Sequence, residues 1–119
     1  MKMMSAISAA LLLAAPAVAQ QMNHQGMNHS MPATAANPYG PAEMKMHQEM
    51  MSATGADASE TWVRKMVEHH RGGVEMSQIV VRNGATPAVR REAMKTIASQ
   101  NREIANLNAM LRKMGKPVQ

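Results

Sequence analysis

The chain has 119 residues and a formal net charge of +5, with 15 methionines, one tryptophan, one tyrosine and neither cysteine nor phenylalanine. Without cysteine, disulfides and thiolate chemistry are excluded. Basic side chains alternate with acidic ones along the expected helices and no aromatic platform accompanies them, so nucleic-acid binding is not expected. Methionine fills cores but specifies them poorly, and this enrichment therefore favours a second role for it.

Residues 1–19 have the pattern of a secretory signal peptide. Lys2 supplies a positive start, an apolar run covers residues 7–15, and Ala17-Val18-Ala19 is a small-residue ending. We expect cleavage between Ala19 and Gln20 and export to the periplasm. The apolar run is too short to span a bilayer, so we expect no stable membrane insertion after cleavage. The mature chain that remains after cleavage is long enough for one small domain.

Residues 20–40 show no apolar periodicity and are rich in Asn, Gln, Gly, Ser and Pro, which predicts a disordered arm. A Met-Asn-His triplet occurs there twice. Methionine and histidine in such a segment can fold around a soft metal ion, with the cost of ordering subtracted from the affinity. The alternative is a polar spacer. The candidate metal ligands in the arm are Met22, His24, Met27 and His29.

Residues 41–119 are expected to form the helical domain, with three helices. The first runs from Pro41 to about Ala53, before Gly55. The second follows a capping box of Asp57 and Glu60 and continues to residue 82, and the third covers residues 86–114. The short turn between the last two predicts an antiparallel hairpin. The fold class is therefore all-α, an antiparallel helical hairpin plus a short N-terminal helix, completed into a bundle by the first helix, a second protomer or both.

The first helix contains a compact set of soft donors. His47 has Met44 one turn before it and Met50 and Met51 one turn after it, because residues three and four apart are neighbours on a helix. Thioethers are neutral, soft ligands that suit Cu(I) and Ag(I) better than Zn(II), Mg(II) or Ca(II). We take Met44, His47 and Met51 as a candidate copper site; the alternative is that these methionines are the apolar stripe of the helix.

The second helix contains Gly72 and Gly73, each of which should cost about 1 kcal/mol relative to alanine. The spacing predicts that Met66, His69 and Met76 face one cavity, with space left by Gly73. His70 lies about 100° round the helix, so it joins from the side or has another partner. The alternative is that the glycines permit close helix approach and the histidines hydrogen-bond across the interface. Supporting hydrogen-bond partners expected on the third helix are Gln100 and Glu103.

Residues 66–76, MVEHHRGGVEM, resemble the Met-x-x-His-His-x-x-Ala-x-Glu-Met signature of the DUF-305 family. Residues 100–111 look like its second signature, Gln-x-x-Glu-Ile-x-x-Leu-x-x-x-Leu. The resemblance implies a small exported helical protein described as ferritin-like, and it makes Met66, His69, His70 and Met76 the shared site. Some members, including the CopM-like proteins, bind copper and assist copper tolerance. This chain has Glu68 where proline is common and Gly73 where alanine is common.

The favoured function is Cu(I) buffering or transfer in copper tolerance, without catalysis. Copper is expected as Cu(I), with Ag(I) or Cu(II) as alternatives, and the expected partners are copper ions, a copper-transfer protein and a second copy of the chain. One alternative function is a non-metal interaction module with a methionine-rich helical surface. A di-iron enzyme is less favoured, because such sites need Glu-x-x-His pairs and no glutamate here has a histidine three residues later.

Overall fold

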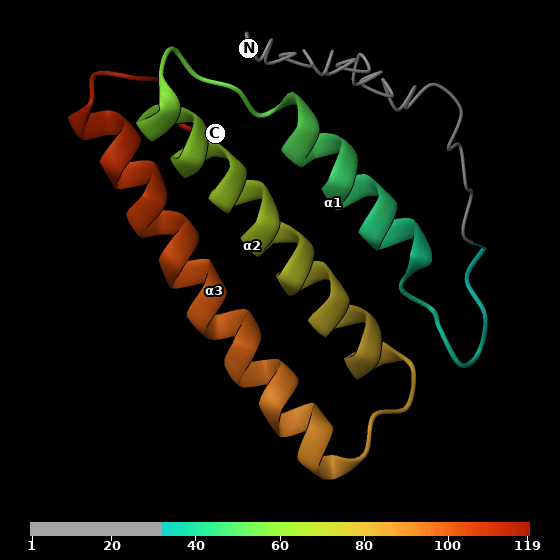
Figure 1. Cartoon of the computed structure of the whole chain (residues 1–119). Coiled ribbons are helices and arrows are strands. Elements are labelled where there is room, and N and C mark those ends of the chain that lie inside the picture. Colours follow the sequence, from blue (N-terminus) through green and yellow to red (C-terminus); the bar gives the residue numbers. More distant parts are fainter. Residues whose placement is uncertain (1–31) are drawn as a thin grey trace, which may run out of the picture.

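Residues 32–119 of the chain fold into three α-helices (Figure 1). The computed structural model describes residues 32–119, in which α1 is Gly40–Ser52, α2 is Ala58–Arg82 and α3 is Pro87–Lys113, with no β-strand. The all-α prediction is confirmed, and each helix begins and ends within about one residue of its expected bounds. The predicted signal peptide and most of the predicted arm, residues 1–31, lie outside the described residues.

The helix ends follow the expected capping chemistry. At the start of α2, Asp57 Oδ1 accepts a hydrogen bond from the Glu60 N–H at 2.9 Å, and Glu60 Oε2 accepts one from the Ala56 N–H at 3.0 Å. The first bond satisfies a donor that a helix start leaves unpaired, and the second pairs an N–H of the preceding loop. Thr86 caps α3 through its hydroxyl, and Gly84 in the preceding turn has a φ of 81°, which favours glycine.

Gly55 has a role different from the expected helix stop. A Cβ atom at this position would lie 2.6 Å from the Cβ of Glu60, well inside contact distance. The missing side chain therefore gives Glu60 room to fold back under the α1–α2 loop. Glu60 is 5% exposed, and Arg64 donates hydrogen bonds to its Oε1 at 2.9 and 2.8 Å. The backbone and side-chain hydrogen bonds hold this carboxylate in place.

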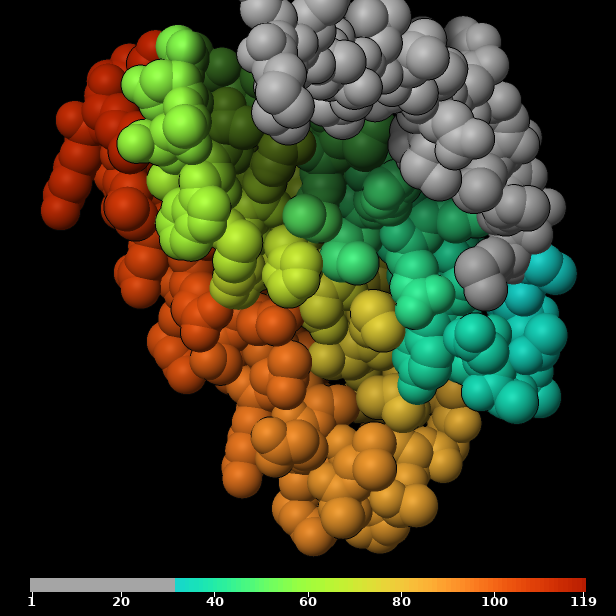
Figure 2. Space-filling model, in the orientation of Figure 1, coloured from blue at the N-terminus to red at the C-terminus, as the bar shows by residue number. Residues whose placement is uncertain are grey.

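Helix α2 lies between the other two helices, as Figure 1 shows. It pairs with α3 as an antiparallel hairpin, and α1 packs against α2 without contacting α3. The three helices therefore form an open layer. The apolar core lies between α2 and α3, with Met66 and Ile104 packed against it; its buried members are Val63, Val67, Leu107 and Leu111. In Figure 2 the end of α2 and the start of α3 project together beyond α1.

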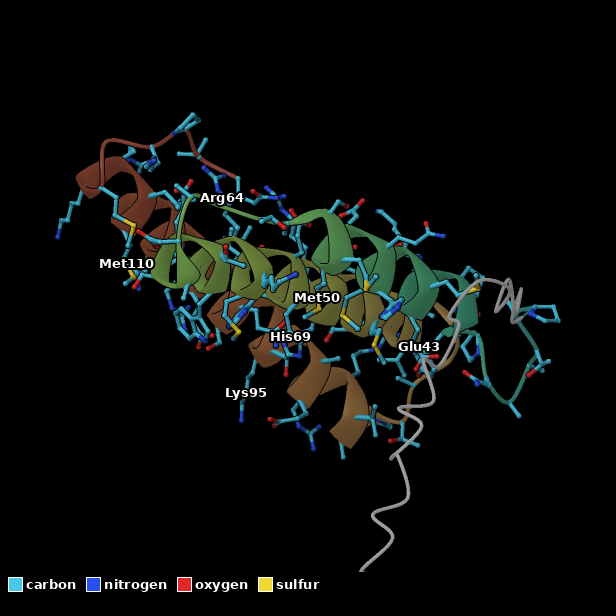
Figure 3. All side chains as sticks on the ribbon, turned by 45° about the horizontal axis from the view of Figure 1, so that its top comes forward. Glu43, Met50, Arg64, His69, Lys95 and Met110 are labelled. Atoms are coloured by element: carbon cyan, nitrogen blue, oxygen red, sulfur yellow. The ribbon has the colours of Figure 1, made fainter. Side chains whose placement is uncertain are left out.

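One flank of α2 is covered by the C-terminal segment. The Gln119 amide donates to Glu68 Oε1 at 2.9 Å and accepts from Arg64 at 2.9 Å, while Arg71 donates to the Gln119 backbone oxygen at 2.8 Å. Figure 3 shows Arg64 on this side of α2 and His69 on the opposite side. No helix within residues 32–119 is both long and apolar enough to cross a membrane.

Candidate metal centre

The two adjacent glycines of α2 each receive a side chain from a different helix. A Cβ at Gly72 would lie 2.9 Å from the Cβ of Met46 in α1, and one at Gly73 would lie 2.8 Å from the amide nitrogen of Gln100 in α3. Close helix approach therefore explains both glycines. The space that we expected Gly73 to leave for an ion is filled by the Gln100 side chain, because α3 packs directly against this turn.

Gln100 of α3 packs against Gly73 of α2, but its side-chain oxygen lacks a hydrogen-bond partner within residues 32–119. Its Oε1 atom is buried and accepts no hydrogen bond from the described residues. A buried acceptor without a partner costs about 1–3 kcal/mol. A donor or a cation beside Gly73 would recover this energy.

The two ring nitrogens of His70 each face an oxygen atom. Nδ1 lies 2.6 Å from the Met66 carbonyl oxygen, and Nε2 lies 2.5 Å from Glu103 Oε2. Donation from Nδ1–H to the carbonyl leaves Nε2 as the nitrogen directed at α3. An ionised carboxylate oxygen carries only lone pairs, so a proton or a cation must lie between it and Nε2. Glu103 of α3 is therefore the side chain that faces Nε2 of His70.

Met66 and His70 open into one groove between α2 and α3. The groove has a volume of about 310 Å³ and brings a methionine from the facing helix against them. Its lining residues are Trp62, Met66, His70, Glu103, Asn106, Leu107 and Met110. Sequence reasoning missed Met110 as a site residue. The available signal was its position seven residues after Glu103 and three after Leu107, on one stripe of α3.

His69 faces the α1 side of α2 instead. Lys65 donates through Nζ to the Met50 carbonyl, and Gly72 receives Met46, so these α2 positions contact α1. His69 falls on the same stripe, four residues after Lys65 and three before Gly72. It is exposed, at the rim of the α1–α2 contact.

Met76 continues this stripe four residues after Gly72 and is half-buried. Met66, His69 and Met76 were predicted to face one cavity, but they lie in two places. Met66 lines the α2–α3 groove, whereas His69 and Met76 lie along α1. The rings of His69 and His70 remain neighbours, with centroids 5.9 Å apart and an edge-to-face orientation.

The candidate ligands of α1 lie on its outer side. Buried Ala42 and the thioether of Met46 face α2, which places positions 44, 47 and 51 on the other side of the helix. Met44, His47 and Met51 share one stripe there, with His47 and Met51 exposed. The arm residues Met22, His24, Met27 and His29 lie outside the described residues.

Two carboxyl groups meet where α1 packs on α2. Burial raises the pKa of Glu68, but hydrogen bonds from Gln119 and Glu49 and the charge of Arg71 outweigh it, so the pKa is lowered overall. The hydrogen bond to Glu68, with burial and the Glu68 charge, raises the pKa of Glu49. Glu49 therefore takes up a proton more readily than an ordinary carboxyl group and can donate it to Glu68.

Nitrogen and oxygen donors alone do not form a centre in residues 32–119. No group of three or more His, Asp or Glu side chains in this part of the chain could hold a metal ion. The additional donors beside His69 and His70 are thioethers. This donor set fits a soft monovalent ion such as Cu(I) or Ag(I) and does not fit Mg(II) or Ca(II).

The described residues form a small all-α protein whose central helix carries a histidine pair flanked by methionines. The family model described as "Domain of unknown function (DUF305)" matches residues 1–111, and the chain belongs to this family. The family resemblance seen in residues 66–76 and 100–111 is thus confirmed. No curated protein and no solved structure matches the chain.

Proposed function

We propose that this protein is an exported, periplasmic copper-binding protein that buffers or transfers Cu(I) without turnover. The observation that carries the proposal is the groove in which Met66 and His70 of α2 face Met110 of α3. Two thioethers and an imidazole are a suitable donor set for Cu(I). Sulfur from methionine also needs no deprotonation and is not lost to disulfide formation in an oxidising compartment.

The ligand clusters support a route for the ion. The arm residues Met22, His24, Met27 and His29 would capture Cu(I) first, with low affinity because ordering the arm costs entropy. Clusters on preformed helices lose less entropy on binding. Exposed His47 and Met51 on α1 and exposed His69 on α2 are accessible for exchange with the arm or with a copper-transfer partner protein.

Competition for Cu(I) against a chromophoric chelator tests the proposal. The purified protein is expected to withdraw Cu(I) from micromolar chelator. Replacing Met44, Met51, Met66 and Met76 together by leucine should weaken this by roughly 10- to 100-fold, as loss of ligands or their supports does at other metal sites. Leucine preserves apolar volume, so the helical content should not change. Failure to compete, or equal competition by the variant, would contradict the proposal.

X-ray absorption of the copper-loaded protein gives an independent measurement. Ligation by thioethers predicts a sulfur shell around copper in addition to imidazole nitrogen. A shell of nitrogen and oxygen alone would reject the Met/His clusters as the copper site, whatever the chelator result. The purified variant without the four methionines serves as the control, since its sulfur shell should be reduced.

A non-metal interaction module remains a second candidate because of one exposed surface. Trp62, Met110 and Met114 are 55%, 43% and 41% exposed and line a further hollow of about 430 Å³. Exposed apolar side chains gathered in this way are typical of protein-docking surfaces. This function predicts partner binding that is unaffected by chelators and by replacing His47, His69 and His70. Loss of partner binding in either condition would exclude it.

A further inference from the structure

The α2–α3 groove contains two residues beyond the histidine–methionine motif that bear on a soft cation. Met110 comes from α3, seven residues after Glu103, and Trp62 comes from α2, four residues before Met66. The groove therefore combines two thioethers, one imidazole and one indole from two facing helices. Neither Trp62 nor Met110 is needed to fill the buried core, which consists of valine and leucine.

The orientation of His70 prepares one nitrogen for a cation. The Met66 carbonyl oxygen, 2.6 Å from Nδ1, fixes the ring and its tautomer, as carbonyl groups commonly do for metal-bound histidine. Nε2 is then directed into the groove, 2.5 Å from the half-exposed carboxylate of Glu103. A cation at Nε2 would take the place of the proton between them. The Glu103 side chain, 51% exposed, has room to move aside.

Trp62 lines the groove together with Met66 and Met110. It is 55% exposed, so half of its surface is available without any rearrangement of the core. Tryptophan attracts cations to its ring face more strongly than other aromatic residues. It is also the only tryptophan in the chain, so tryptophan emission reports on this groove and on the adjoining hollow that Trp62 also lines.

We propose that Trp62, Met66, His70 and Met110 form a binding site for a single soft monovalent cation in the α2–α3 groove, distinct from the clusters on α1. His70 Nε2 and the two thioethers are the donors, and the indole face covers the ion from the side. Glu103 balances its charge from the rim. The inference rests on the proposed Cu(I) function but assigns one ion to one groove and adds Trp62 and Met110 to the site.

The first test is titration of the purified protein with Ag(I), a redox-stable probe of Cu(I) sites, followed by tryptophan fluorescence. Binding is expected to quench the emission of Trp62 and to saturate with one ion. Met110→Leu should weaken this response roughly 10- to 100-fold. Met94→Leu is the matched control, because Met94 is an exposed methionine of α3 that does not line the groove, and it should leave the response unchanged.

The second test measures Ag(I) affinity by chelator competition in Trp62→Phe. Phenylalanine keeps an aromatic ring but is a weaker cation partner, so the groove affinity should fall roughly two- to fivefold. Circular dichroism on each variant confirms the helical fold. A response of Trp62 that is lost in Met110→Leu and kept in Met94→Leu supports the groove site.

The two proposals fail in different ways. If the protein competes for Ag(I) but Trp62 emission does not respond, or responds equally in Met110→Leu, the groove site is rejected and the proposed function stands. If the protein does not compete for Ag(I) or Cu(I) at all, both are rejected. Quenching by a purified partner protein with no response to Ag(I) would assign the groove to docking instead and would also overturn the inference.

Discussion

The two interfaces of α2 differ in the kind of side chain that forms them. Against α3 it buries valine and leucine side chains, and Leu111 and Val67 are 0% exposed. Against α1 it offers Gly72, the carboxylate of Glu68 and a lysine that donates to a backbone carbonyl. Since apolar burial contributes most to stability, we expect the α2–α3 hairpin to hold the fold and α1 to be the weaker attachment.

The difference separates stability from candidate ligand chemistry. The valine and leucine core carries no donor atom, whereas thioethers and imidazoles lie around its edges, at the α2–α3 groove and along α1. Substitutions of ligands at these edges should therefore leave folding largely intact. This separation makes ligand variants informative, because a loss of metal binding will not be confused with unfolding.

The largest effect is expected from Leu111→Ala in the hairpin core. Truncating a fully buried leucine removes apolar contacts and leaves a cavity, which should lower the free energy of unfolding by about 2–5 kcal/mol. Urea denaturation followed by circular dichroism measures this. The adjacent, exposed Met110→Leu should change it by less than about 0.5 kcal/mol. Equal effects of the two substitutions would contradict the assignment of the core.

Gly72→Ala should disturb the α1 interface specifically. The new Cβ would lie 2.9 Å from the Cβ of Met46, next to the α1 backbone, so no change of side-chain rotamer relieves the overlap. Overpacking of this kind costs about 1–3 kcal/mol, partly offset by the better helix propensity of alanine. Limited proteolysis should then cut the loop between α1 and α2 faster than in the unchanged protein. An unchanged cleavage rate would show that α1 is not held in this register.

Glu60 should make the same loop sensitive to acid. The hydrogen bond from the Ala56 N–H, with those from Arg64 and Lys116, lowers the pKa of Glu60 from 4.5 to about 2. A carboxyl group whose pKa is lowered by folding stabilises the folded state above its unfolded pKa, and this contribution is lost as pH falls toward 2. Unfolding free energies measured between pH 5 and pH 2 should therefore decline less steeply in Glu60→Gln. Glu92→Gln, at an exposed position of α3, should retain the full decline.

The smallest effect is expected from Gly73→Ala, the neighbour of Gly72. Here the overlapping atoms are the end of the Gln100 side chain, which can swing away, and the buried, unpaired Oε1 would then reach water. The gain in helix propensity, about 1 kcal/mol, should make the variant neutral or slightly more stable. Thermal unfolding of the two alanine variants side by side provides the measurement. Stronger destabilisation at Gly73 than at Gly72 would reverse the comparison.

Helix positions were predictable from sequence because their signals are local. Asp57 with Glu60, Thr86 with Pro87, and Gly84 each act within four residues, and all three signals were realised. The grouping of site residues was not predictable in the same way. Gly72 and Gly73 indicate close packing, but the sequence does not show which side chain fills the space beside each glycine. Met110 likewise became part of the groove only through the pairing of α2 with α3.

Among the described residues, each helix packs only against the helix next to it in sequence. Short loops at residues 53–57 and 83–86 join the helices. Contacts beside the 83–86 turn close a short stretch of chain, whereas the buried core, which includes Val63 and Leu111, lies at the other end of the hairpin and joins segments that are far apart in the sequence. A hairpin of this kind can form progressively from its turn, because local contacts cost less chain entropy than distant ones, and the core at the open end then closes last. Methionines at the edge of the core would consequently stay open to oxidation or aggregation until the hairpin has closed along its whole length.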